Sequence, residues 1–312
     1  MTTNQRLDDR LDSAVPIILD GANGSELERL GARMDDGVWC ARALADCPDL
    51  VHKVHRRYID AGADVITTNS YSATRVAMQT YGLATYFEEW NRRSVHIACE
   101  ERDRSSRAES IFVAGSVSTY GRFSGLDDDT ITDHFRAQAE ILAAEGVDLL
   151  ILETLGSTER TVKAMVSATR DLGVPVWVSI SCVRDRETNA VMFGIEESGE
   201  STDAVDIYGP FGDAAHDIMS VGGSAVLMMH SVMDVTEDAV KLLRENFSGP
   251  VGAYPNAGYW TRPNWTFVDQ VTPDEYLADA RRWVAAGAAI VGGCCGVGVE
   301  QIRALAEGLK EI

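Results

Sequence analysis

Two adjacent cysteines, Cys294 and Cys295, stand near the end of the sequence in the motif Gly-Gly-Cys-Cys-Gly, residues 292–296. Thiolates are zinc ligands and nucleophiles, and the flanking glycines let a metal ion or a substrate approach closely. A tightly packed strand end of small residues is the alternative explanation, because free cysteine often behaves as a small hydrophobe. The other four cysteines are scattered, unlike the disulfide scaffold of a short secreted chain, so we expect reduced thiols.

Other polar side chains stand where short apolar runs rich in β-branched residues end. In chain order they are Asp20, Asn69, Glu153, His230 and Tyr254. Each has an ordinary structural explanation, such as a helix cap for the acids or a hydrogen-bonded rim position for the histidine. A purely structural set of strand ends would seldom combine acids, an amide, an imidazole and thiols. These residues therefore form a candidate site if one architecture brings the ends of the runs together.

The elements that must position these residues follow a repeated unit of a helical pattern, a glycine and a short apolar run. Glycine after a helix supplies the left-handed C′ position, and a continuous apolar run suits a parallel strand buried on both faces. Eight runs are predicted as strands: Ile17–Gly21, Asp64–Asn69, Ile111–Ser116, Asp148–Glu153, Val174–Ile180, Ala225–His230, Pro250–Tyr254 and Ala289–Cys294. The sequence therefore predicts an α/β fold, a single (β/α)8 TIM barrel with its site where the strands end. An open doubly wound sheet is the alternative, although no Gly-x-Gly-x-x-Gly motif follows the first run.

The composition suits one large globular domain, with 312 residues of which 45% are hydrophobic and 24% charged. We expect a polar N-terminal segment over residues 1–14 and a barrel domain over residues 15–312. The formal net charge of −20 argues against nucleic acid and anionic membrane surfaces as partners. The sequence shows neither a signal peptide nor the run of roughly 20 apolar residues that a membrane span needs, so we expect a cytoplasmic protein.

Five motifs at the predicted strand ends point to a known family. They are Asp-Gly-Ala-Asn-Gly-Ser-Glu-Leu-Glu at 20–28, Thr-Asn-Ser-Tyr at 68–71, Glu-Thr at 153–154, Tyr-Pro-Asn-Ala-Gly at 254–258 and Gly-Gly-Cys-Cys-Gly at 292–296. In this order, and over nearly the whole chain, they resemble the homocysteine S-methyltransferase family, zinc-dependent barrels that methylate a thiol. The resemblance implies methyl transfer to homocysteine, giving methionine.

The resemblance also implies a zinc cofactor and a substrate pocket. Seven residues would bind the substrate: Asp20, Gly21, Asn69, Glu153, Thr154, Tyr254 and Asn256. Asp20 and Glu153 would hold the amino group of the amino-acid thiol, since carboxylates and an ammonium make charge-assisted hydrogen bonds. Zinc deprotonates a coordinated thiol, so no catalytic group is expected beyond the metal-bound substrate thiolate.

The sequence departs from the family at the end of the sixth strand, where the family has an asparagine followed by a zinc-binding cysteine. His230 and Ser231 stand at these two positions. One interpretation is a zinc site of Cys294, Cys295 and His230, because imidazole is a common zinc ligand and a bulge could turn it inward. A second is a weak, different or absent metal, and a third is a misaligned sixth strand with Cys182 supplying sulfur from the fifth.

Aromatic residues after the seventh strand suggest where a methyl donor would bind. Tyr259, Trp260 and Trp265 could cage a small onium donor, such as a sulfonium or a betaine, since aromatic faces attract cations. A lid that buries these aromatics is the alternative. We expect no room for the folate and corrinoid modules of methionine synthase, and a separate corrinoid protein stays open as the donor.

Three wider alternatives also stay open. The chain could be a repurposed family member with a different methyl acceptor, or a metal-free amino-acid-binding barrel without catalysis. It could also form a homo-oligomer.

Overall fold

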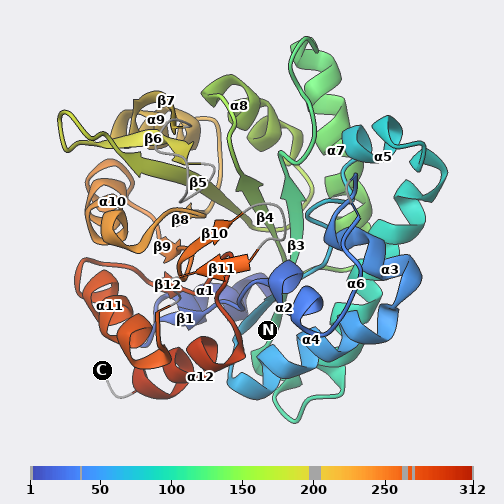
Figure 1. Ribbon diagram of the computed structural model, residues 1–312, viewed down its shortest axis with the longest axis horizontal. Helices are drawn as coiled ribbons and strands as arrows, with labels where there is room; N and C mark the ends of the chain where they lie inside the picture. Colours follow the sequence, from blue (N-terminus) through green and yellow to red (C-terminus); the bar gives the residue numbers. More distant parts are fainter. Residues whose placement is uncertain (1–2, 36, 197–204, 262–265, 269–270, 311–312) are drawn as a thin grey trace.

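Eight parallel strands form a closed ring in the computed structural model, which describes residues 3–35, 37–196, 205–261, 266–268 and 271–310 (Figure 1). They are β1 (Ile17–Ile18), β2 (Val65–Thr67), β3 (Phe112–Ser118), β4 (Leu149–Thr154), β5 (Val176–Arg184), β8 (Ala225–Met229), β9 (Val251–Tyr254) and β12 (Ile290–Val291). The strand order is β1-β12-β9-β8-β5-β4-β3-β2, and a parallel bridge between Leu19 and Val65 joins the two ends. Each strand overlaps a predicted one, so the TIM barrel is confirmed.

Helices connect the strands and cover the outside of the ring. They are α2 (Asn23–Arg29), α3 (Ala43–Asp46), α4 (Pro48–Ala61), α5 (Arg75–Thr80), α6 (Phe87–Asp103), α7 (Asp128–Ala144), α8 (Glu159–Ala168), α9 (Phe211–Met219), α10 (Met233–Asn246), α11 (Pro273–Ala285) and α12 (Val299–Gly308), with 3-10 turns at Cys40–Arg42, Ala84–Tyr86 and Ala108–Ser110. Local signals set their ends: α4 stops at Gly62, whose φ of 107° is left-handed. At the start of α11, Thr272 and Glu275 form a capping box. Among the described residues, no helix is long and apolar enough to cross a membrane.

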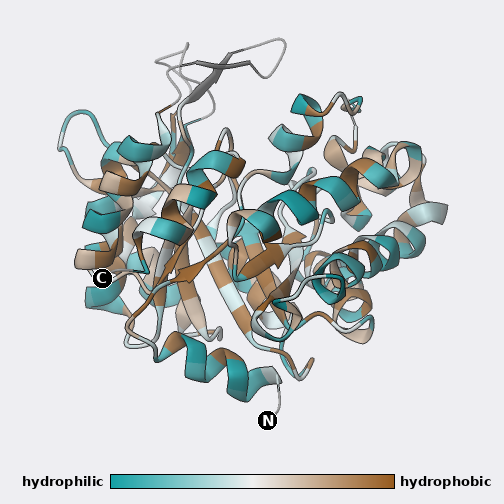
Figure 2. Cartoon of the chain, turned by 90° about the horizontal axis from the view of Figure 1, so that it is seen from below, coloured by the Kyte–Doolittle hydropathy of each residue, from teal (hydrophilic) through white to brown (hydrophobic). Residues whose placement is uncertain are grey.

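The strands separate two hydrophobic cores, because successive side chains of a strand point to opposite faces. In β8, for example, Leu227 and Met229 pack inside the barrel, whereas Val226 and Met228 pack against the helices. Figure 2 shows the hydrophobic strands surrounded by helices whose outer faces are hydrophilic. This alternation decides which residues at the strand ends can face the barrel axis.

The polar N-terminal segment contains a helix, α1 (Thr3–Leu11), which lies across the end of the barrel where the strands begin (Figure 2). Leu7 is 1% exposed and belongs to the core inside the barrel. The Arg10 guanidinium donates to the carbonyls of Val15 and Pro16 and to the Asp64 carboxylate. The segment thus closes the bottom of the barrel, leaving the other end for the site.

The structure contains two pairs of antiparallel strands that were not predicted from the sequence. β5 continues past Ile180 to Arg184 and pairs with β6 (Val191–Glu196), which pairs with β7 (Val205–Pro210). The second pair, β10 (Tyr259–Thr261) and β11 (Thr266–Val268), lies in the aromatic segment that follows the seventh predicted strand. Both lie in connections that follow barrel strands, where insertions leave the barrel itself unchanged.

Candidate functional site

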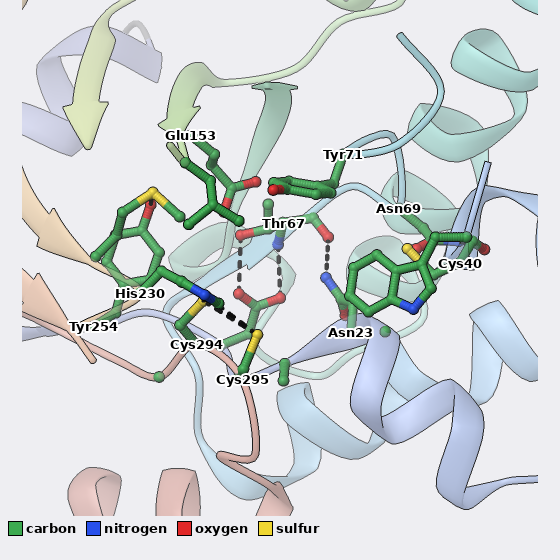
Figure 3. Close-up of a pocket in the computed structure, with 18 of the residues that line it drawn as sticks. Asn23, Cys40, Thr67, Asn69, Tyr71, Glu153, His230, Tyr254, Cys294 and Cys295 are labelled. Carbon is green, nitrogen blue, oxygen red and sulfur yellow. Dashed lines mark hydrogen bonds between the residues drawn. The ribbon is translucent and has the colours of Figure 1, made fainter. Parts of the chain in front are cut away.

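A cavity of about 740 Å³ opens at the carboxyl ends of the barrel strands (Figure 3). Eight sequence-predicted residues line it: Asp20, Gly21, Asn69, Glu153, His230, Tyr254, Cys294 and Cys295. They come from loops or strand ends spread along almost the whole chain. The barrel therefore brings together the polar strand ends that suggested a site.

An imidazole and two thiols form a compact group on the cavity wall. The Nδ1 atom of His230 lies 3.4 Å from Cys294 Sγ and 3.3 Å from Cys295 Sγ, and the two sulfurs are 3.9 Å apart. Sulfur and nitrogen atoms bound tetrahedrally to one zinc ion, at about 2.3 Å and 2.0–2.1 Å, lie roughly 3.5–3.8 Å from one another. The three donor atoms thus have the chemistry and nearly the spacing of three zinc ligands. In the described part of the chain, no other group of three or more histidine, cysteine or acidic residues has metal-binding spacing.

The backbone of His230 explains how its ring reaches the thiols. Met229 faces the barrel interior, so regular alternation would turn the next side chain outward. His230 instead has a φ of 43°, a left-handed conformation that is uncommon for a non-glycine residue. Such backbone strain costs of the order of 1–3 kcal/mol and tends to cluster at functional sites. The strand end is distorted at the position where the sequence analysis considered a bulge.

The neighbouring residues make no such contact with the thiols. The Ser231 hydroxyl donates to the Met229 carbonyl at 2.8 Å and accepts from the Cys182 backbone N–H at 2.9 Å. Cys182 is buried in the extended part of β5 and does not belong to the group of possible metal ligands. The hydrogen bond from Cys294 to Cys295, together with burial, raises the pKa of the Cys294 thiol well above its usual value, although His230 acts in the opposite direction.

Asp20 is a buried acid that lines the cavity at the end of β1. It accepts hydrogen bonds from the Thr67 backbone N–H at 2.8 Å and from the Thr67 hydroxyl at 2.9 Å. Burial nevertheless raises its pKa from 3.8 to about 8, and the nearby Glu153 carboxylate adds to that rise. A positively charged ligand group would stabilise the ionised form of this carboxyl.

Glu153 is the second acid of the cavity. It accepts a hydrogen bond from the Ser116 hydroxyl, and burial raises its pKa from 4.5 to about 7. Among the described residues, no lysine or arginine lines the cavity to balance the two acids. The site is therefore suited to a ligand that carries its own cation.

Two amides provide further acceptors beside these acids. Asn69 donates its amide N–H to the Cys40 carbonyl, and Asn23 donates its own to the Thr67 carbonyl. Both Oδ1 atoms are buried without a hydrogen-bond partner in the structure. Such groups cost free energy unless a ligand or water supplies a donor. Asn23 is not among the predicted site residues, although it belongs to the first of the five motifs.

An aromatic group that the sequence analysis missed lines another part of the cavity. The ring centroids of Trp39 and Tyr71 are 6.0 Å apart and those of Tyr71 and Tyr120 are 5.8 Å apart, both in edge-on contacts. Gly24 lies against the Trp39 indole, where an added Cβ would be 2.4 Å from the ring. Tyr71 belongs to a quoted motif, but no pattern links it to residues so far away in the sequence.

The predicted donor cage lies mostly beyond what the structure describes. Trp265 is outside the described residues. Tyr259 and Trp260 lie in β10, but their side chains are outside the described part. The cage therefore stays a prediction.

Two predicted substrate-binding residues are near the cavity without lining it. Thr154 follows the inward-facing Glu153 and so points away from the barrel axis, where its hydroxyl donates to the Ser179 carbonyl at 2.6 Å. The Asn256 side chain accepts a hydrogen bond from the Cys295 backbone N–H at 3.1 Å. In the structure, Asn256 thus contacts the loop that carries Cys294 and Cys295 and does not line the cavity.

Comparisons with known proteins agree with this architecture. The sequence model of the homocysteine S-methyltransferase family matches residues 17–309. Homocysteine S-methyltransferase 4 of Zea mays is 32% identical, over 94% of this chain and 89% of its own length. Homocysteine S-methyltransferase YbgG of Bacillus subtilis is 30% identical over 95% of each chain.

Further matches extend the range of substrates named among the relatives. Selenocysteine methyltransferase of Astragalus bisulcatus is 29% identical, over 92% of this chain and 90% of its own length. The metallated form of the homocysteine methyltransferase MmuM from Escherichia coli has the same fold, with a TM-score of 0.77 at 24% identity over 98% of this chain and all of that one. The chain therefore belongs to the homocysteine S-methyltransferase family of enzymes.

Proposed function

We propose that this enzyme methylates the sulfur of homocysteine, giving methionine, with zinc held by His230, Cys294 and Cys295. The observation that carries the proposal is the grouping of one imidazole nitrogen and two sulfurs on the wall of a cavity that is also lined by the acids Asp20 and Glu153. Three protein ligands leave the fourth position of a tetrahedral zinc ion for a substrate, as in catalytic zinc sites. When bound, zinc would lower the pKa of the substrate thiol and so supply a thiolate at neutral pH.

The acids and amides would bind the amino-acid end of homocysteine. Asp20 and Glu153 would hold its ammonium group, and the free Oδ1 atom of Asn69 would add an acceptor. Because both acids have raised pKa values in the unliganded chain, binding would release protons near neutral pH. Gly21 and Tyr254 also line the cavity and would help to define the shape of the homocysteine pocket.

We place the methyl donor against the aromatic group of Trp39, Tyr71 and Tyr120. Aromatic faces attract onium cations such as sulfonium or trimethylammonium groups, and the acidic cavity adds to that attraction. The methyl carbon forms a bond with the homocysteine sulfur while its bond to the donor breaks. The bonding electrons stay with the donor, whose onium group becomes neutral, so no general acid is needed. The main task of the protein is to align the two reactants.

Purified enzyme would test the proposal in two steps. Elemental analysis should find about one zinc per chain, lost when His230 or Cys294 is replaced. Mass spectrometry should then detect methionine when homocysteine is mixed with a sulfonium, a betaine or a methyl-corrinoid protein, with an onium compound as the active donor. A chain that stays metal-free after zinc supplementation, or that methylates none of these mixtures, would contradict the proposal.

The same screen should include selenocysteine as an acceptor, since one relative is named for it. Faster transfer to the selenol than to homocysteine would identify a different acceptor on the same site. A reducing cytoplasm would suit either reaction, because all six cysteines are free.

A further inference from the structure

Ser231 uses its hydroxyl as a bridge between two barrel strands. The hydroxyl accepts from the Cys182 N–H of β5 and donates to the Met229 carbonyl of β8. Ser231 is 5% exposed and does not line the cavity. Both hydrogen bonds of the Ser231 hydroxyl are therefore with backbone groups, and neither involves the thiols.

The backbone of Ser231 is also tied to the next strand. Its carbonyl accepts from the Asn256 N–H at 3.0 Å, and the Asn256 side chain in turn accepts from the Cys295 N–H. His230 itself has only a long backbone contact, 3.4 Å from its N–H to the Tyr254 carbonyl. The residue that carries the strained left-handed φ is thus held chiefly by its neighbours in sequence.

We propose that Ser231 is a positioning residue that holds His230 in its left-handed conformation, so that the imidazole faces Cys294 and Cys295. The inference rests on the proposed metal site for its consequence in zinc binding. Without the bridge, the end of β8 would relax toward the extended conformation that most residues prefer, and alternation would carry the imidazole away from the cavity.

This role explains why a serine accompanies the histidine. A hydroxyl is a strong donor and acceptor, whereas a thiol is weak as both. A cysteine at position 231 would hold the backbone poorly. The two residues therefore work as a pair, in which one supplies a nitrogen to the metal and the other fixes the backbone that presents it.

Three measurements on Ser231→Ala test the inference. Titration of the full-length protein with zinc against a competing chelator should show affinity about 10- to 100-fold weaker, the usual effect of removing a group that orients a metal ligand. The absorption spectrum of the cobalt-substituted protein should lose the contribution of the histidine ligand. A crystal structure of the metal-free variant should show His230 with a negative φ and its ring displaced from the two sulfurs.

Ser94→Ala is the matched control. Ser94 is also buried and its hydroxyl donates to a backbone carbonyl at 2.7 Å, but it lies in α6, away from the cavity. This variant should keep the zinc affinity and cobalt spectrum of the parent. Ser231→Thr retains the hydroxyl, so its zinc affinity should remain within a few-fold of that of the parent. This result would show that the loss in Ser231→Ala comes from the missing hydrogen bonds and not from general destabilisation.

The outcomes separate this inference from the proposed function. If Ser231→Ala binds zinc as tightly as Ser94→Ala and its crystal structure keeps His230 beside the thiols, Ser231 has no positioning role. If the parent binds no zinc, the proposed metal site is wrong, and the position of His230 in the metal-free variant still decides whether Ser231 holds it.

Discussion

The Nδ1 atom of His230 lies 3.3 Å from the Sγ atom of Cys295, although 65 residues separate them in the chain. Their strands are not neighbours, since β9 lies between β8 and β12. The loop after β9 spans the gap: the Pro255 carbonyl accepts from the Cys294 N–H, and the Ala257 N–H donates to the Cys295 carbonyl. The imidazole and the thiols therefore belong to one hydrogen-bonded assembly of three strand ends.

Replacing His230 should remove zinc about as effectively as replacing one of the thiols. His230→Ala and Cys294→Ser each leave two protein ligands, which cannot fix a tetrahedral metal site. Competition with a chelator measures the affinity, and His216→Ala, on the exposed face of α9, serves as the control. If His230 is a ligand that Ser231 holds in place, Ser231→Cys should leave the zinc affinity unchanged or lower it. No loss with His230→Ala and a large gain with Ser231→Cys would instead mean that His230 is not a ligand.

Glu153→Gln keeps the shape of the side chain and removes its charge. Homocysteine binding should weaken by about 1.5–3 kcal/mol, the range for a hydrogen bond to a charged group. Isothermal titration calorimetry gives the dissociation constant directly. Glu159→Gln, in α8 and paired with Lys163 away from the cavity, should bind as the parent does. Equal affinity in both variants would exclude Glu153 from the ammonium site.

Several strand ends could be predicted from the sequence because two local signals combine there. A glycine follows the preceding helix, as at Gly62, Gly146 and Gly287, and a short apolar run comes next, so chain direction places the polar residue after the run at the mouth of the barrel. What the sequence left open was the orientation of neighbouring residues. Glu153 and Thr154 belong to the same motif, yet alternation sends only the first toward the cavity.

Other features depend on contacts between distant segments, for which a single sequence has no local signal. Trp39 precedes a short 3-10 turn and contacts Tyr71, which in turn contacts Tyr120, and these three residues come from separate connections of the barrel. β7 was missed for a different reason: it is mostly exposed, so it lacks the buried apolar run by which the barrel strands were recognised. The left-handed φ of His230 follows from its surroundings and not from its residue type.

The stability of the metal-free, unliganded enzyme should fall as the pH rises from about 5 to 8. The folded chain binds protons at Asp20 and Glu153 up to about pH 8 and 7, whereas the unfolded chain releases them near the ordinary pKa values of 3.8 and 4.5. Because the folded state then holds more protons, the free energy of unfolding decreases with pH in this window. Urea denaturation at several pH values measures the slope. Asp20→Asn should flatten it, and an unchanged slope would mean that Asp20 is not the group responsible.

Leu7→Ala should destabilise the barrel although it lies far from the cavity. Removing a buried leucine side chain costs about 2–5 kcal/mol, depending on how far the surroundings collapse. Leu7 packs inside the barrel from α1, whereas Asp8 on the same helix is exposed, so Asp8→Ala is the control. Urea denaturation gives the free energy of unfolding of both variants. If Leu7→Ala lowers it by less than about 1 kcal/mol, α1 does not stabilise the barrel.

Trp39→Leu should weaken the binding of the methyl donor without changing the binding of homocysteine. A cation over an aromatic face contributes about 0.5–2 kcal/mol, so the KM for an onium donor should rise about 2- to 30-fold. Trp39→Phe keeps an aromatic face, so its donor KM should rise less. Steady-state kinetics at saturating homocysteine give the donor KM, and calorimetry checks that homocysteine still binds.

Tyr86→Leu controls for the loss of an aromatic ring elsewhere, since Tyr86 is 46% exposed and stacks on Trp90 outside the cavity lining. Its donor KM should match that of the parent. If Trp39→Leu also leaves the donor KM unchanged, the donor does not contact Trp39. The aromatic segment around β10 would then become the favoured donor site, and replacing Tyr259 or Trp260 should raise the KM instead.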